Sequence, residues 1–296
     1  MTKAAPPPKT PQHSDAAAAV IASLPPQPAP PRPTMLVTKE HRRFVEFADA
    51  VRRNRYIGVC YGPPGIGKTL SARTYSGADE WNDWYIARWD KDATIPHFIT
   101  QQRTALWTPR VTTTPRELER EVPALCQQVS WAVEDAVNGG QDPLLNPTGQ
   151  GCAHTELLIV DEADRLRTAG LEQLRDFFDR HHLGLILIGM PGLEKRLARY
   201  PQLYSRVGFA HHYRPLSSEE LTFVLTHHWN TIGHTLDPSD FTDTQAMAAV
   251  ARITGGNFRL IERLFSQIQR VLQINELNTI TSEVVEAARE TLVIGA

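Results

Sequence analysis

Cysteine is scarce in this chain, and its scarcity argues against two kinds of cross-linked architecture. Three cysteines occur among 296 residues, at Cys60, Cys126 and Cys152. They lie far apart and share none of the short spacings that bring cysteines to one metal ion. We therefore expect neither a disulfide framework nor a zinc site. Cys60 lies in an apolar run and is expected to be a buried core thiol.

Long hydrophobic runs and a strong net charge are also missing. No stretch approaches the roughly 20 apolar residues of a membrane span, and the N-terminus lacks the pattern of a secretory signal. The formal net charge is −2, so the chain has no general basic surface for nucleic acid. These absences predict a cytoplasmic protein with no membrane partner. Any contact with DNA must then come from a local group of cations or from several subunits together.

Proline and alanine dominate residues 1–34. A segment of this composition cannot bury enough apolar surface to offset the entropy of an ordered chain. We predict a disordered arm with polyproline II character, in which residues 16–24 are either a plain linker or a helix that forms on a partner. Order is expected from Thr38, which can cap the amphipathic helix TKEHRRFVEFADAVRR.

Residues 56–71 read YIGVCYGPPGIGKTLS, and their turn fits the phosphate-binding pattern G-x-x-x-x-G-K-[ST]. Glycines let the backbone wrap closely around a phosphate, so that N–H groups and the positive end of the following helix point at the anion. Lys68 is expected to reach the β- and γ-phosphates of a nucleotide, and Thr69 to offer its hydroxyl to Mg²⁺. The predicted binding loop consists of Gly62, Pro63, Pro64, Gly65, Ile66, Gly67, Lys68, Thr69 and Leu70.

A second motif follows further along, where the apolar run LLIV ends in Asp161 and Glu162. A continuous apolar run is typical of a parallel strand that is buried on both faces. Asp161 is expected to hold Mg²⁺ through water at the nucleotide, and Glu162 to orient and deprotonate the attacking water. Acidic pairs are common on surfaces, but a pair that follows a buried strand in a chain with a phosphate loop favours the functional interpretation.

Strand and helix patterns alternate up to about residue 190, which predicts an α/β domain with a parallel sheet and helices on both faces. Helices are predicted at 168–181 and at 115–136, the latter with a kink or break at Pro123. Glycine, asparagine and proline indicate a loop at 139–151. Further strands are predicted at 84–89, at the start of 105–114 and at 183–190.

Strand patterns end before Ser217, and helical patterns follow at 217–229, 242–253, 257–274 and 281–292. The sequence therefore predicts three parts. These are an arm over 1–34, an α/β nucleotide-binding domain over 35–214 and a small all-helical lid domain over 215–296.

A phosphate loop, a strand that ends in DEAD and a helical lid form the plan of the AAA+ ATPases, which the chain resembles from Thr38 to its C-terminus. The resemblance implies an ATPase that uses ATP and Mg²⁺ and assembles into a ring or a filament. The segment RYPQLYSRVGF is similar to the box whose arginine enters the neighbouring subunit's active site. It makes Arg206 the candidate arginine finger, although Arg196 and Arg199 lie close enough to compete.

Two further positions bear on this resemblance. GGNFR, at 255–259, resembles the sensor-2 motif, in which Arg259 would contact the γ-phosphate of its own subunit. Met190 departs from the family pattern, because the strand LILIGM ends where the family commonly has Asn, Thr or Ser. Methionine cannot polarise a water or a phosphate. Either a neighbour takes this role or hydrolysis is slow, which would suit a switch better than a motor.

Within the AAA+ family, the chain is similar to the transposition regulators of the TniB, TnsC and Mu B type, on the segments IGMPGLEKRL and ITSEVVEAARETL. This resemblance implies an ATPase that oligomerises on double-stranded DNA and recruits or activates a transposase. Two alternatives stay open. One is an AAA+ motor or loader that acts on a protein or replication partner, and the other is a nucleotide-gated scaffold with little turnover.

The DNA contacts are the least explicit part of the sequence. Arg103, Arg110 and Arg116 are interleaved with the threonines at 112–114, a set of cations and hydroxyls suited to phosphate oxygens. We expect them to lie in a strand-to-helix loop that faces DNA. An ordinary solvated loop explains the same residues equally well.

Overall fold

The computed structural model describes residues 35–88, 94–138 and 151–292. The predicted arm and all but the last residue of the predicted loop at 139–151 lie outside this range. Residues 35–296 form one compact unit. Within the described ranges, no helix combines the length and the apolar character needed to cross a bilayer.

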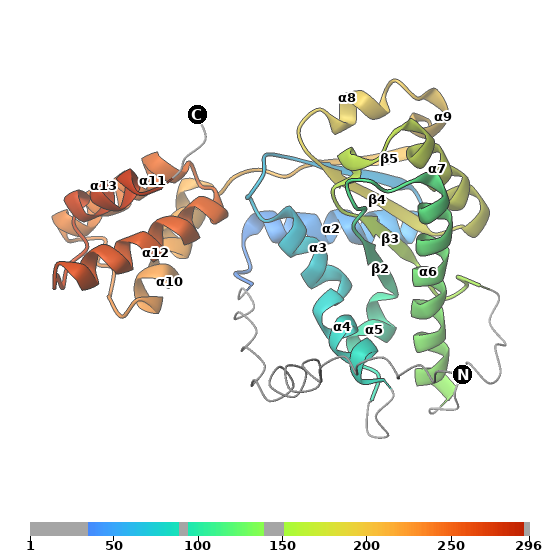
Figure 1. The fold of residues 1–296 in the computed structure, drawn as a ribbon, viewed down its shortest axis with the longest axis horizontal. Helices are drawn as coiled ribbons and strands as arrows, with labels where there is room; N and C mark the ends of the chain where they lie inside the picture. The colour runs from blue at the N-terminus through green and yellow to red at the C-terminus, as the bar shows by residue number, and fades with distance from the viewer. Residues whose placement is uncertain (1–34, 89–93, 139–150, 293–296) are drawn as a thin grey trace, which may run out of the picture. The chain divides into compact units, whose positions relative to one another are not determined.

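The described strands form a five-stranded sheet with the order β2-β3-β4-β1-β5 (Figure 1). All four pairings are parallel, which confirms the predicted sheet type. Since parallel strands run in one direction, the segments that follow β1, β3 and β4 leave the sheet at the same edge. The strands are β1 (Ile57–Tyr61), β2 (Thr104–Trp107), β3 (Leu157–Val160), β4 (Gly184–Gly189) and β5 (Val207–His212).

Helices cover both faces of the sheet, as predicted. Leu157 and Ile159 of β3 pack in a hydrophobic cluster with α2 and α3, whereas Leu158 and Val160 pack on the other face with α6 and α7. This two-sided burial explains why LLIV is continuously apolar. The helices of this part are α2 (Lys39–Asn54), α3 (Lys68–Ser76), α4 (Ala78–Ala87), α5 (His97–Gln102), α6 (Pro115–Asn138), α7 (Thr168–His181), α8 (Leu193–Leu197) and α9 (Pro201–Tyr204), with a 3-10 turn η1 (Ala163–Arg165).

The C-terminal part is helical and has its own hydrophobic cluster, in which Trp229 packs edge-on against Phe265. Each helix begins at a capping side chain that accepts a backbone hydrogen bond, which is why the sequence located these helices well. The helices and their caps are α10 (Ser218–Thr231, Ser217), α11 (Phe241–Thr254, Asp240), α12 (Phe258–Ile274, Asn257) and α13 (Ser282–Glu290, Thr281).

The strand predicted at 84–89 is wrong, because residues 78–87 form α4. Apolar residues in so short a segment fit a strand and a helix equally well. The aromatic rings decide between the two, since Trp81 stacks on Tyr85 with ring centroids 5.7 Å apart. Residues four apart meet on one face of a helix but not on a strand.

Two further predictions for the α/β part need correction. α6 is not broken at Pro123 but continues through it. Proline removes the N–H that would bond to the carbonyl of Glu119, and Glu119 is exposed, so water can replace that donor. The sequence also gave no sign of β5, because this strand lies at the edge of the sheet and buries only alternate residues partially.

Candidate nucleotide-binding site

The phosphate loop joins the C-terminal end of β1 to the N-terminus of α3, as the motif requires. Gly65 and Gly67 have φ angles of 77° and 104°, a region that residues with a Cβ atom rarely adopt. A Cβ atom on Gly62 would lie 2.3 Å from the carbonyl oxygen of Tyr213. No side chain caps the first turn of α3. Its N–H groups therefore point into the loop and suit a bound phosphate.

Lys68 is folded back onto this loop. Its Nζ donates hydrogen bonds to the carbonyl oxygens of Gly62 and Pro63, both at 2.6 Å. Burial lowers the pKa of the Lys68 ammonium, while negative charge on Cys60, Asp161 and Asp164 opposes this shift. Burial in turn raises the pKa of Cys60 strongly, which agrees with its predicted role as a core thiol. A phosphate in the loop would give the ammonium a charged partner in place of two carbonyls.

The acidic pair after β3 provides oxygen atoms of two different kinds. Asp161 is buried, and its Oδ1 accepts a hydrogen bond from the N–H of Glu162 at 2.9 Å. Glu162 has an exposed side chain and a φ angle of 53°. Thr69 is exposed on the first turn of α3. A carboxylate and a hydroxyl are hard oxygen ligands, so Asp161 and Thr69 fit the coordination chemistry of Mg²⁺.

The end of β4 lies between these two motifs, because β4 pairs with both β1 and β3. The N–H of Gly62 donates to the carbonyl of Gly189 at 3.4 Å. Met190 follows and is 40% exposed, and its N–H donates to Oδ1 of Asp164 at 3.1 Å. Asp164 thus places a polar group where Met190 provides none. The sequence did not single it out, although it is the second aspartate of DEAD.

The helical part contacts the phosphate loop through the N-terminus of α12. The N–H of Arg259 donates to the carbonyl of Gly65 at 3.1 Å, and Nδ2 of Asn257 donates to the carbonyl of Pro64 at 2.8 Å. The Arg259 charge also acts on Lys68 and helps to lower its pKa. The sensor-2 candidate therefore lies at the loop, and Asn257 is a neighbour that the sequence indicated only as a possible helix cap.

The three candidate finger arginines differ in their contacts. Arg206 lies directly before β5 and forms an ion pair with Asp179 of α7. Its position is at the opposite end of β1 from the phosphate loop, about 16 Å away for a five-residue strand. Arg196 instead donates to the carbonyl oxygens of Asp164, at 3.0 Å, and Leu166. Arg199 is exposed.

The structure separates the three arginines that the sequence grouped as DNA contacts. Arg103 precedes β2 and pairs with Glu156, whereas Arg110 follows β2 and Arg116 lies in the first turn of α6. The expectation that Arg103 belongs to the same loop is therefore wrong, because the length of β2 lies between them. Arg110 and Arg116 are both exposed at the edge of the sheet where the phosphate loop emerges.

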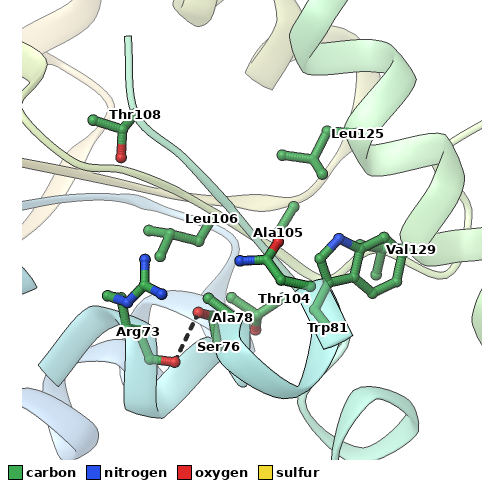
Figure 2. Close-up of a pocket in the computed structure, with 11 residues that line it drawn as sticks. Arg73, Ser76, Ala78, Trp81, Thr104, Ala105, Leu106, Thr108, Leu125 and Val129 are labelled. Carbon is green, nitrogen blue, oxygen red and sulfur yellow. Dashed lines mark hydrogen bonds between the residues drawn. The ribbon is translucent and has the colours of Figure 1, made fainter. Parts of the chain in front are cut away.

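A small cavity of about 140 Å³ lies between α3, α4, β2 and α6 (Figure 2). Arg73 and Ser76 line it on one side, and Trp81 and Val129 on another. Its volume is well below the 300 Å³ or more of most ligand sites, and none of the predicted site residues lines it. The cavity is therefore separate from the nucleotide site.

Comparison with known proteins agrees with this geometry. Residues 51–197 match the AAA domain family. The chain is 41% identical over 273 residues to the potential ATP-binding protein of Staphylococcus aureus, covering 87% of this chain and 96% of that protein.

Solved structures share the fold at low identity. The RuvB Holliday junction branch migration motor of Thermotoga maritima has a TM-score of 0.52 at 18% identity, covering 88% of this chain and 71% of that one. The ORC2 protein of Aeropyrum pernix in its ADP form has a TM-score of 0.51 at 16% identity, covering 88% and 70%. The family match, the Staphylococcus relative and the phosphate loop lead to one assignment: the chain belongs to the AAA domain family of P-loop NTPases.

Proposed function

We propose that this protein is a slow ATPase that assembles on double-stranded DNA when ATP is bound and there recruits or activates a transposase. The observation that carries the proposal is the position of Arg206. It lies at the opposite end of β1 from the phosphate loop of its own chain. A finger at this end can serve only a neighbouring subunit, so the active site is complete only in an assembly.

Each residue of the site has a defined task in this proposal. The loop N–H groups and Lys68 bind the phosphates, and Arg259 reaches them from α12. Thr69 and Asp161 would hold Mg²⁺, which when bound neutralises charge on the phosphate oxygens. Glu162 orients the attacking water and takes its proton. Slow turnover is supported by Met190 at the end of β4 and by the ion pair that Glu162 makes with Arg165.

DNA contact is assigned to Arg110 and Arg116 at the β2-to-α6 loop. Each subunit offers two exposed cations, so one subunit binds DNA weakly and an assembly binds it well. The transposase partner rests on the resemblance of residues 188–197 and 280–292 to transposition regulators. The favoured alternative is a motor that acts on DNA or on a protein partner.

Light scattering and electron microscopy of the protein with a linear duplex test this proposal. We expect rings or filaments with a slowly hydrolysed ATP analogue and dispersed protein with ADP. A four-way DNA junction serves as a second substrate. Assembly that requires the junction would favour the motor, and protein that stays monomeric under all conditions would contradict the proposal.

A further inference from the structure

Arg165 contacts two parts of the molecule that the proposed function keeps separate. Its Nη2 forms an ion pair with Oε2 of Glu162, three residues earlier. Its Nη1 donates a hydrogen bond to the carbonyl oxygen of Pro109, at 3.0 Å. Pro109 is buried and directly precedes the exposed Arg110. One guanidinium therefore joins the proposed general base to the loop proposed to contact DNA.

The backbone around Glu162 is held in place, so its side chain is the part that can change position. The N–H of Glu162 donates to Asp161 Oδ1, and its carbonyl accepts from the N–H of Arg165 at 3.0 Å. Its φ angle of 53° lies in the left-handed region, which residues with a Cβ atom adopt only when the surrounding structure imposes it. The carboxylate in turn is paired with Arg165.

This pairing bears directly on the chemistry. A general base must use a carboxylate lone pair to hold the attacking water within hydrogen-bond distance. Here the guanidinium occupies lone pairs of Oε2. The Arg165 and Glu162 side chains are 36% and 44% exposed, so their pair is weak enough to be broken by a modest change at either end.

The second contact supplies such a change. The backbone of β2 is tied to β3 by the bond from the Asp161 N–H to the Trp107 carbonyl, at 2.9 Å. The chain leaves the sheet directly after Trp107, so Pro109 is the first point at which movement of residues 108–114 reaches the site. A ligand that pulls this loop outward removes the Pro109 carbonyl from Nη1 and weakens the hold on Glu162.

We propose that Arg165 is a positioning residue that restrains Glu162 until double-stranded DNA engages the loop at 108–114. The inference rests on the proposed function, because it concerns the ATPase base and its DNA. It predicts low ATP turnover without DNA and a rise when DNA is added.

The test is steady-state ATP turnover of the full chain with and without a linear duplex. Arg165→Ala is expected to raise the DNA-free rate about two- to fivefold, as for the loss of a half-exposed ion pair, and to reduce the stimulation by DNA by the same factor. ATP affinity should not change, since Arg165 does not contact the phosphate loop. Arg180→Ala is the matched control, because Arg180 also pairs with a carboxylate within its own helix, at Asp176. It should leave both rates unchanged.

A double-mutant cycle shows whether the effect passes through Glu162. In the Glu162→Gln background, replacing Arg165 should have no effect on the remaining turnover. Arg165→Gln, which keeps a donor for Pro109 but carries no charge, guards against a folding defect of the alanine variant. An unchanged or lower DNA-free rate in both folded Arg165 variants would overturn the proposal. Absence of any turnover in the wild type would instead overturn the ATPase assignment itself.

Discussion

The side-chain amide of Asn257 donates a hydrogen bond to the carbonyl oxygen of Pro64 at 2.8 Å, across 193 residues of sequence. The same side chain caps α12 by accepting a hydrogen bond from the N–H of Leu260. Asn257 thus ties the start of the helix that carries Arg259 to the loop that binds phosphate. Lid position and nucleotide binding are therefore coupled through one residue.

Replacing Asn257 should separate these two roles. Asn257→Asp keeps a capping oxygen but loses the donor to Pro64, so the fold should persist and ATP affinity should fall about threefold to tenfold. Asn257→Ala loses the cap as well and should also lower the melting temperature. Titration with a fluorescent ATP analogue and thermal unfolding measure the two effects. Wild-type affinity in Asn257→Asp would show that the contact plays no part in binding.

Lys68→Ala should weaken ATP binding about 10- to 100-fold, because a charged donor to the phosphates is lost. The Lys68 Nζ bonds only to two carbonyls of its own loop in this structure, so the fold should tolerate the change. Lys195→Ala, at an exposed position of α8, is the control. Calorimetric titration with ATP gives the comparison, and equal affinities for the two variants would mean that the loop is misassigned.

The phosphate loop could be predicted from the sequence because its residue types are imposed locally. Gly65 and Gly67 occupy backbone conformations that glycine adopts without strain, and Lys68 follows directly. The buried strand before Asp161 was recognisable for the same reason, since burial on both faces leaves an uninterrupted apolar run. Where a local rule dictates the residue, the pattern identifies the structure.

Contacts between distant segments left no such pattern. Nothing in the sequence indicates that Asn257 reaches Pro64, or that Arg165 reaches Pro109. The arginines at 103 and 110 are close in sequence, yet β2 places them at opposite ends of a strand. Pro123 shows the converse, because an exposed carbonyl lets a helix tolerate a residue that usually interrupts it.

Glu162→Gln should retain ATP affinity and slow hydrolysis about 100-fold or more, because the amide can hold water but cannot take its proton. Phosphate release under saturating ATP is the measurement. Glu119→Gln, at an exposed position of α6, controls for loss of charge. Turnover of Glu162→Gln at the wild-type rate would assign the base to another residue.

Arg206→Ala should bind ATP normally but lose assembly, with turnover lower by about a thousandfold. Arg199→Ala, at a nearby exposed position, should behave as wild type. The strongest evidence comes from mixing Arg206→Ala with Glu162→Gln. In a mixed assembly, an intact Glu162 from one subunit meets an intact Arg206 from the next, so turnover should return. A mixture as inactive as its components would argue against a finger supplied by the neighbouring subunit.

The central claim, that ATP assembles this protein on double-stranded DNA, is tested most directly by fluorescence anisotropy of a labelled duplex across a salt series. We predict binding with a slowly hydrolysed ATP analogue and little binding with ADP. Affinity should fall steeply as salt rises, and replacing both Arg110 and Arg116 by alanine should flatten the salt slope. Equal affinity with ATP analogue and ADP, or no binding in either state, would contradict the account.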